Sequence, residues 1–177
     1  HIDDAMMHSM NRHTDSREVK SVLKKLREIG GFTLRTSLIV GYPGETEEMF
    51  DSLCEFVKES EFDRLGAFTY SQEEGTVAAE LPDQIDERVK LERLDNLMSL
   101  QAEISQRLNN KRVGKTYDVI IDEYDEDIMM YIGRSRAEAP DVDGVIYVTS
   151  EKSVEVGSIV SVRITDFAEY DLLGECV

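Results

Sequence analysis

Residues 37-SLIVGYPGETEEMF-50 carry the clearest structural pattern in the chain. The apolar run 38-LIV-40 is typical of a strand that is covered on both faces, as in a parallel sheet. Pro43 and Gly44 then form a tight turn, and Thr46 can cap a helix that starts directly afterwards. The carboxyl end of a parallel strand is where α/β proteins usually bind their ligands. The pattern therefore predicts a strand, a turn and a helix around a possible binding edge.

The residues on either side extend this pattern into a strand–helix–strand unit. Asp15 and Glu18 form a capping box for a helix that ends at Gly30-Gly31. The predicted elements are a short helix at 3–11, a helix at 15–29, a strand at 32–40, a helix from 46, a strand at 64–70 and a long helix at 86–110. In the helix from 46, the residues expected to be buried are Phe50, Leu53, Cys54 and Val57. In the long helix, the apolar side consists of Leu91, Leu94, Leu97, Leu100, Ile104 and Leu108. The joins are short, which favours parallel strands.

The hydrophobic period changes to two after Val113. Five short runs follow at 117–121, 128–132, 145–148, 159–164 and 170–176, with turns such as 140-PDVDG-144 between them. Short strands at this spacing predict a small antiparallel five-stranded barrel. We therefore expect two domains, 1–110 and 111–177.

Composition limits the function classes. The net charge of −17 opposes general binding to a nucleic acid backbone and suits a cytoplasmic protein or one with a basic partner. No apolar run approaches the ~20 residues that cross a bilayer. The two cysteines, Cys54 and Cys176, lack the spacing of a zinc or iron–sulfur site, and no metal ligands are predicted.

Two loops are candidates for binding. The turn at Gly41 lacks the lysine of a phosphate loop, but the missing side chain could let a flat ligand approach the backbone. The segment 70-YSQEEGT-76 leaves the next strand beside it. Arg35 and Arg64 could each bind a carboxylate or form an ordinary surface ion pair. A plain turn and a solvated loop are the alternative interpretations.

Four motifs are similar to the methylthiotransferase family of radical S-adenosylmethionine (SAM) enzymes. They are 10-MNRHT-14, 34-LRTSLIVGYPGETEEMF-50, 64-RLGAFTYSQEEGTVAAEL-81 and 93-RLDNLMSLQAEIS-105. The last 67 residues resemble a TRAM domain, a barrel similar to oligonucleotide-binding folds. The resemblance implies an α/β domain that forms the carboxyl part of a TIM-like radical SAM barrel, followed by the TRAM barrel.

The resemblance also implies a reaction. The parent enzyme would be a transferase that uses SAM and two 4Fe-4S clusters to add a methylthio group to the β-carbon of an aspartate in ribosomal protein S-twelve. Relatives that modify tRNA tend to have Arg and Pro where this chain has Glu73 and Glu74, and a basic terminal domain. Residues 111–177 carry 7 Lys and Arg against 15 Asp and Glu, or −8, which favours a basic protein partner over RNA. A tRNA-modifying relative and a non-catalytic acidic binding module remain alternatives.

Site residues follow from the resemblance by position. Ile39, Val40 and Gly41 would pack on the adenine or ribose of SAM, the backbone of 68–70 (Phe68 to Tyr70) would bind it, and Arg35 would anchor its carboxylate. The general family pattern G-x-I-x-G-x-x-E is altered here, because Ser37 fills the first glycine position and Glu45 comes one residue late. No catalytic residue is assigned.

The family's C-x-x-x-C-x-x-C signature is absent from this sequence. Without those cysteines no cluster can deliver an electron to SAM, so we expect the isolated chain to be inactive. A partial barrel also leaves open strand edges. We therefore expect the chain to self-associate, or its helix at 86–110 to cover the gap.

Overall fold

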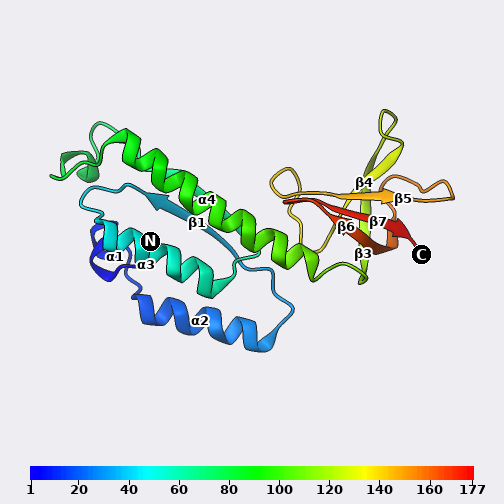
Figure 1. Ribbon diagram of the computed structural model, residues 1–177, viewed down its shortest axis with the longest axis horizontal. Helices are drawn as coiled ribbons and strands as arrows, with labels where there is room; N and C mark the ends of the chain where they lie inside the picture. The colour runs from blue at the N-terminus through cyan, green and yellow to red at the C-terminus, as the bar shows by residue number, and fades with distance from the viewer. The chain divides into compact units, whose positions relative to one another are not determined.

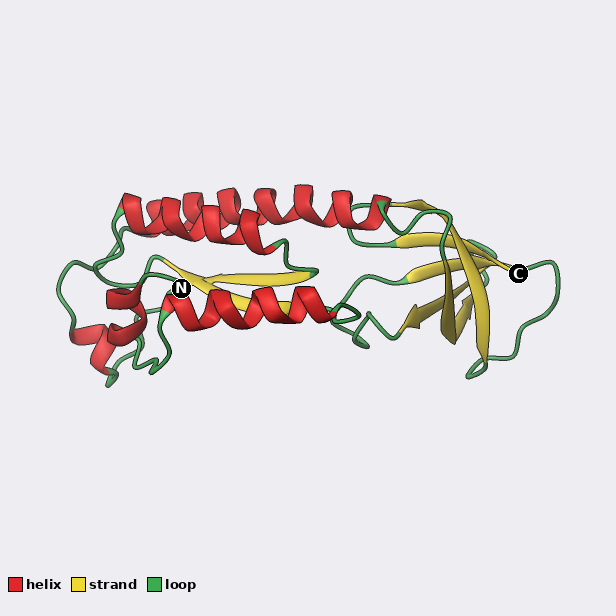
Figure 2. Ribbon diagram, turned by 90° about the horizontal axis from the view of Figure 1, so that it is seen from below, coloured by secondary structure: helices red, strands yellow, loops and turns green.

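The computed structural model describes all 177 residues, which divide into two compact units, His1–Ile104 and Ser105–Val177. Figure 2 shows that helices predominate in the first unit and strands in the second. No helix is both long enough and apolar enough to span a membrane.

The first unit is built around a two-stranded parallel sheet (Figure 1). Its elements are α1 (Asp4–Ser9), α2 (Ser16–Ile29), β1 (Arg35–Val40), α3 (Glu47–Ser60), β2 (Arg64–Thr69), a 3-10 turn η1 (Val77–Glu80) and α4 (Glu87–Asn110), whose last residues belong to the second unit. β1 and β2 pair in register from Arg35 with Arg64 to Val40 with Thr69. The parallel strand–helix–strand unit is therefore confirmed, whereas two strands do not by themselves establish the expected partial TIM-like barrel.

The predicted helix caps are confirmed. The Asp15 carboxylate accepts a hydrogen bond from the amide of Glu18 at 2.8 Å, and the Thr46 hydroxyl accepts one from the amide of Met49 at 3.3 Å. The buried stripe of α3 differs in one position, because Phe56 is buried and Cys54 is only half-buried. The larger aromatic side chain contacts the Phe62 ring edge-on, with the centroids 5.6 Å apart.

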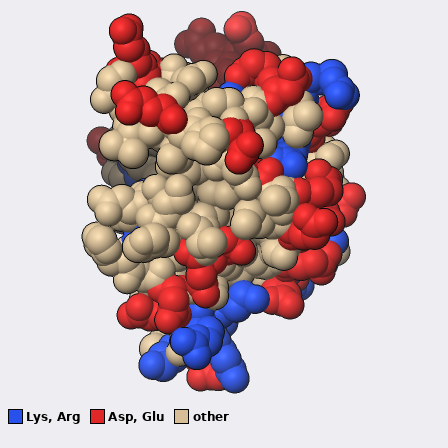
Figure 3. Space-filling model, turned by 90° about the vertical axis from the view of Figure 1, so that its left-hand side faces the viewer, with Lys and Arg blue, Asp and Glu red and all other residues tan.

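α2 is amphipathic, yet none of its residues is buried. Val22 and Ile29 on its apolar side are 49% and 72% exposed. Its polar side carries five Lys and Arg against two Glu, and Figure 3 shows Lys and Arg atoms gathered at the lower edge of the first unit, where α2 lies. The sequence period predicted this helix correctly, but its apolar side is only partly covered within the unit, where Val19, Leu23 and Leu26 are half-buried.

The second unit contains a closed barrel of five strands in the order β3-β4-β5-β7-β6. The strands are β3 (Thr116–Asp125), β4 (Met130–Ser135), β5 (Ile146–Thr149), β6 (Ile159–Phe167) and β7 (Leu172–Cys176). The core consists of fully buried aliphatic residues, namely Val119, Ile121, Ile146, Val148, Val162, Ile164 and Leu172. Alternating inward residues thus fill the barrel, as the period of two predicted.

The prediction of a wholly antiparallel barrel is wrong, because β5 and β7 run parallel. Strand directions cannot alternate all the way around a closed ring with an odd number of strands. At least one neighbouring pair must then be parallel. Here β7 turns back from β6 and fills the place between β6 and β5.

Candidate functional site

One face of the two-stranded sheet is open and carries several of the predicted site residues. Ile39 on β1 pairs in register with Phe68 on β2, and the two side chains are 39% and 60% exposed. Ser37 pairs with Gly66 one step earlier on the same face, and Arg35 is exposed at its far end. The sheet therefore brings Arg35, Ile39 and Phe68 together on a surface that is apolar at one end and cationic at the other.

Val40 and Tyr70 lie elsewhere. The Val40 side chain is fully buried on the opposite face, beside the buried Leu38, because successive residues of a strand point to opposite sides. Tyr70 directly follows β2 and packs edge-on against Tyr42, with ring centroids 5.3 Å apart. Its hydroxyl is buried and has no hydrogen-bond partner. Only the backbone of Val40 can thus take part in a site on the open face.

The turn at Gly41 is not open on the side where a side chain would stand. Gly41 has a φ of +73°, and a Cβ atom built there would lie 2.3 Å from Cγ of Lys90. The Lys90 stem therefore fills the space that was predicted to admit a flat ligand. A ligand could approach only the other side of this turn.

Lys90 is itself buried and joins the ends of both strands. Its ammonium group donates to the backbone oxygen of Tyr70 at 3.1 Å, lies 5.3 Å from the centre of the Tyr70 ring, and forms an ion pair with Glu87. Its methylene groups pack against Gly41, which follows β1. One side chain of α4 thus fixes the carboxyl ends of β1 and β2.

Glu45 forms a second buried connection between the turn and α4. Its carboxylate accepts hydrogen bonds from the Gly41 amide at 3.0 Å and from Arg93 at 2.8 Å, and it lies 3.6 Å from Nε2 of His1. Arg93 also donates to the backbone oxygen of Glu45 at 3.1 Å and to the Glu47 carboxylate at 3.2 Å. Burial raises the pKa of Glu45 above its ordinary value of 4.5, and the charge of Arg93 offsets this only in part.

The sequence pattern did not predict that Lys90 and Arg93 face inward, because the buried side of α4 was assigned from its leucines. The buried positions are Lys90, Arg93, Leu97, Gln101, Ile104, Ser105 and Asn109. Leu91, in contrast, is 59% exposed. This helix covers turns and chain ends rich in backbone polar groups, so long polar side chains occupy its inward face; Gln101, for example, donates to the backbone oxygen of Phe62 at 2.9 Å.

A groove of about 400 Å³ lies beside the open edge of β1. α1 contributes Met7 and α2 contributes Val19 and Leu23, while Arg35 and Ile39 line it from the strand. The groove thus connects the half-buried apolar side of α2 with the face that carries the predicted residues.

The barrel has a polar network and an acidic groove of its own. Glu138 is buried, accepts from Arg112 at 2.6 Å, and also accepts from the amide and hydroxyl of Ser135. Although burial alone would raise the pKa of Glu138, the hydrogen bond and charge of Arg112 hold it below 4.5. A separate groove of about 400 Å³ is lined by Asp122, Glu123, Ile132, Arg134, Ala139, Pro140, Asp141, Asp143, Gly144 and Val145.

No group of three or more His, Cys, Asp or Glu side chains is arranged to hold a metal ion. Cys54 and Cys176 are both free and half-buried, and they belong to different units. Burial and the nearby Asp51 raise the pKa of the Cys54 thiol, which disfavours the thiolate form that metals bind.

Known proteins with similar sequences give these features a context. Residues 113–177 match the TRAM domain family. The whole chain is 50% identical to the ribosomal protein uS12 methylthiotransferase RimO of Geotalea uraniireducens and 48% identical to that of Trichlorobacter lovleyi, covering 40% of each relative. The RimO of Clostridioides difficile is 47% identical over 99% of this chain and 39% of its own length. The chain thus spans about 40% of the length of the curated relatives that it matches. The chain is thus similar to RimO proteins along its whole length, and its residues 113–177 match the TRAM domain family.

Proposed function

We propose that this chain is part of a methylthiotransferase that adds a methylthio group to the β-carbon of an aspartate in ribosomal protein uS12. The observation that carries the proposal is the 50% identity to a uS12 methylthiotransferase over the entire chain. Since the chain covers 40% of that relative, the activity belongs to a longer protein. A ribosomal substrate would also place the enzyme in the cytoplasm.

The open face of β1 and β2 fits one wall of a SAM site. Ile39 and Phe68 offer exposed apolar surface on which an adenine ring can stack, and Gly66 beside them has no side chain to obstruct it. Arg35 at the far end of the face can pair with the SAM carboxylate. When bound, SAM would supply the methyl group and the chemistry that removes hydrogen from the aspartate. The chain's own residues would bind and orient it.

Three further residues would act around this wall in different ways. Val40 would contribute backbone groups only, and Gly41 would set the position of the turn through its packing with Lys90. Tyr70 directly follows β2 and has a buried hydroxyl that lacks a partner, so it could accept or donate a hydrogen bond if a ligand displaced its surroundings.

The residues present do not fit an iron–sulfur cluster. A 4Fe-4S cluster needs a set of cysteine thiolates, and this chain has two cysteines in separate units. We infer that the ligands of both clusters lie in other parts of the longer protein. The isolated chain would then bind SAM weakly at most and would not cleave it reductively.

We also infer that the first unit forms the carboxyl part of a TIM-like barrel. The sheet has only two strands, its outer edges have no further strand, and no residue on the apolar side of α2 is fully buried. Further strands on the edge of β1 would cover that side. If they are absent, self-association of the isolated chain through this edge is expected.

The TRAM barrel would bind the basic substrate. Residues 113–177 hold 5 Lys and Arg against 15 Asp and Glu, a difference of −10, which repels RNA phosphates and attracts a Lys- and Arg-rich protein. This charge favours uS12 over tRNA, and it also suits an acidic module that binds a basic protein without catalysis.

The test uses the full-length protein with reconstituted clusters, SAM and a reductant, incubated separately with uS12 and with tRNA. We expect methylthio addition to an aspartate of uS12 by mass spectrometry, and no change in tRNA. The double variant Ile39→Ala, Phe68→Ala should raise the KM for SAM, whereas Val77→Ala, at a position 80% exposed outside the face, should not. Modification of tRNA in place of uS12, or no modification of either, would contradict the proposal.

A further inference from the structure

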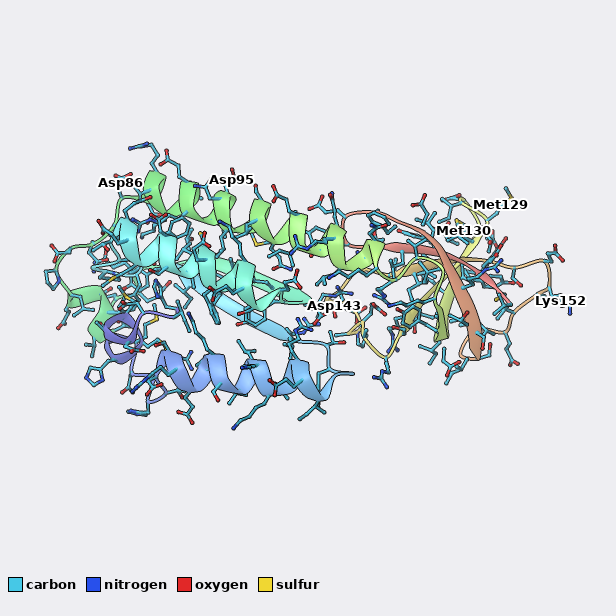
Figure 4. All side chains as sticks on the ribbon, turned by 60° about the horizontal axis from the view of Figure 1, so that its bottom comes forward. Asp86, Asp95, Met129, Met130, Asp143 and Lys152 are labelled. Atoms are coloured by element: carbon cyan, nitrogen blue, oxygen red, sulfur yellow. The ribbon has the colours of Figure 1, made fainter.

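The hairpin between β3 and β4 ends in an exposed apolar tip. Asp125 pairs with Met130 and Tyr124 with Tyr131, whose rings lie 4.8 Å apart. The Asp125 carboxylate accepts from the amides of Asp127 at 2.9 Å and Ile128 at 3.3 Å, which fixes the turn. Figures 1 and 4 show this hairpin extending from the barrel, with Met129 at its outer end. The tip is thus an ordered part of the barrel.

Met129 occupies this tip at a conformational cost. Its φ is +54°, in the left-handed region that glycine and asparagine adopt most readily. Among the five residues other than glycine with positive φ, it is the only apolar one; the others are Asn11, Glu61, Asp83 and Asp141. Its side chain is also 75% exposed, so packing within the barrel does not repay the cost. Strained residues cluster at ligand-binding and switch regions, so this one motivates a hypothesis of contact with another molecule.

Two neighbours extend the apolar surface, and several carboxylates adjoin it in the sequence. Tyr124 is 44% and Ile128 is 46% exposed. Residues 122–129 contain five Asp or Glu and no Lys or Arg. Of these carboxylates, Asp122 forms an ion pair with Arg134 at 3.0 Å, at the base of the hairpin. The tip therefore combines exposed apolar side chains with carboxylates close by in the sequence, and protein interfaces likewise have an apolar centre and a polar rim.

We propose that Tyr124, Ile128 and Met129, here called the hairpin tip, form a docking arm that inserts its apolar side chains into a Lys- and Arg-rich protein surface. The carboxylates around the tip would pair with that surface and would repel a nucleic acid. This inference rests on the proposed function, in which the basic partner is uS12. It adds that the contact depends on apolar burial at the tip as well as on the overall charge of the barrel.

The deciding variant is Met129→Asn. Asparagine tolerates a positive φ better than methionine does, so the fold should be retained and its melting temperature should stay the same or rise. Binding to purified uS12, measured by isothermal titration calorimetry, should weaken about tenfold, because the buried methionine surface is lost. The matched control is Val156→Asn, which removes another apolar side chain of the barrel that is 53% exposed. It should leave the affinity for uS12 unchanged.

Added salt gives a second measurement on the same variants. Raising the ionic strength should weaken uS12 binding of the unchanged chain steeply, while the ratio of affinities between the unchanged chain and Met129→Asn should persist, because apolar burial is not screened. If uS12 binds, but Met129→Asn binds it as tightly as Val156→Asn does, the docking arm is refuted and the proposed function stands. If the unchanged chain does not bind uS12 at all, the docking arm is refuted, and the proposed function then depends on the methylthio-transfer assay with the full-length protein.

Discussion

Replacing Gly41 with alanine should destabilise the first unit through two separable effects. The backbone at Gly41 has a φ of +73°, which costs an alanine about 1–2 kcal/mol. The new Cβ atom would also lie 2.3 Å from Cγ of Lys90, and 3.1 and 3.2 Å from Cβ and Cδ of the same side chain. All three distances are shorter than ordinary van der Waals contacts. Overpacking of this kind costs about 1–3 kcal/mol. Together the two effects predict a loss of about 2–5 kcal/mol.

The chain supplies a matched control at Gly44. Its φ is +81°, but an added Cβ atom would meet nothing within 4 Å. Gly44→Ala should therefore show the conformational cost alone, about 1–2 kcal/mol. The double variant Gly41→Ala, Lys90→Ala should recover the steric part, so the two substitutions should couple by about 1–3 kcal/mol in a double-mutant cycle.

Urea unfolding followed by circular dichroism at the helix band is a suitable assay, because all four α-helices begin in the first unit. In thermal unfolding, each kcal/mol corresponds to a shift of about 4–8 °C for a unit of this size. If Gly41→Ala costs no more than Gly44→Ala, Lys90 does not fill the turn in the way described. Additive effects of Gly41→Ala and Lys90→Ala would lead to the same conclusion.

Three other predictions concern buried carboxylates and a helix cap. Glu138→Ala should lower the free energy of unfolding of the barrel, measured in denaturant, by about 3–5 kcal/mol, because Arg112 would then lack its buried ion-pair partner. Glu175→Ala, which removes an exposed ion pair, should lower it by less than about 1 kcal/mol. Since the pKa of Glu138 is lowered in the folded state, its contribution to stability should be present above pH 4.5 and lost as the pH falls through that lowered pKa. Glu45 should show the opposite pH dependence, because its pKa is raised in the folded state: stability should decrease as the pH rises from 4.5 through the folded pKa. Carbon-13 NMR of its carboxyl group should show a titration midpoint above 4.5. A normal or lowered midpoint would contradict this expectation. Thr46→Ala should cost about 1 kcal/mol in thermal unfolding, and Thr46→Ser should restore most of it.

Local patterns in the sequence predicted most of the elements. The caps at Asp15 and Thr46, the parallel strands on either side of α3, and the five strand runs after Val113 all follow from spacing or capping chemistry, which act between near neighbours. Strand starts were less accurate. β1 begins at Arg35 rather than Phe32, because the pairing with β2 begins only there.

The parts that could not be predicted depend on contacts between distant residues. Lys90 and Arg93 lie more than 40 residues from Gly41 and Glu45, and nothing in the pattern of α4 marks them as inward-facing. The direction of β7 was misjudged for a different reason, because it follows from closure of the ring and is independent of any single strand's composition. The grouping of Ile39 with Val40 followed chain order, whereas the pleat of the strand separates their side chains.

The place of β7 between β5 and β6 has a consequence for how the barrel is made in the cell. The ribosome releases the chain from its amino end, so residues 172–176 are the last of the five strands to emerge. Until then β5 and β6 each have an unpaired edge that only β7 can fill. The barrel can therefore close only after residues 172–176 have been synthesised. The parallel pair β1 and β2, made from residues 35–69, can form much earlier. Any delay in supplying β7 lengthens the time during which nascent chains can join one another through those edges.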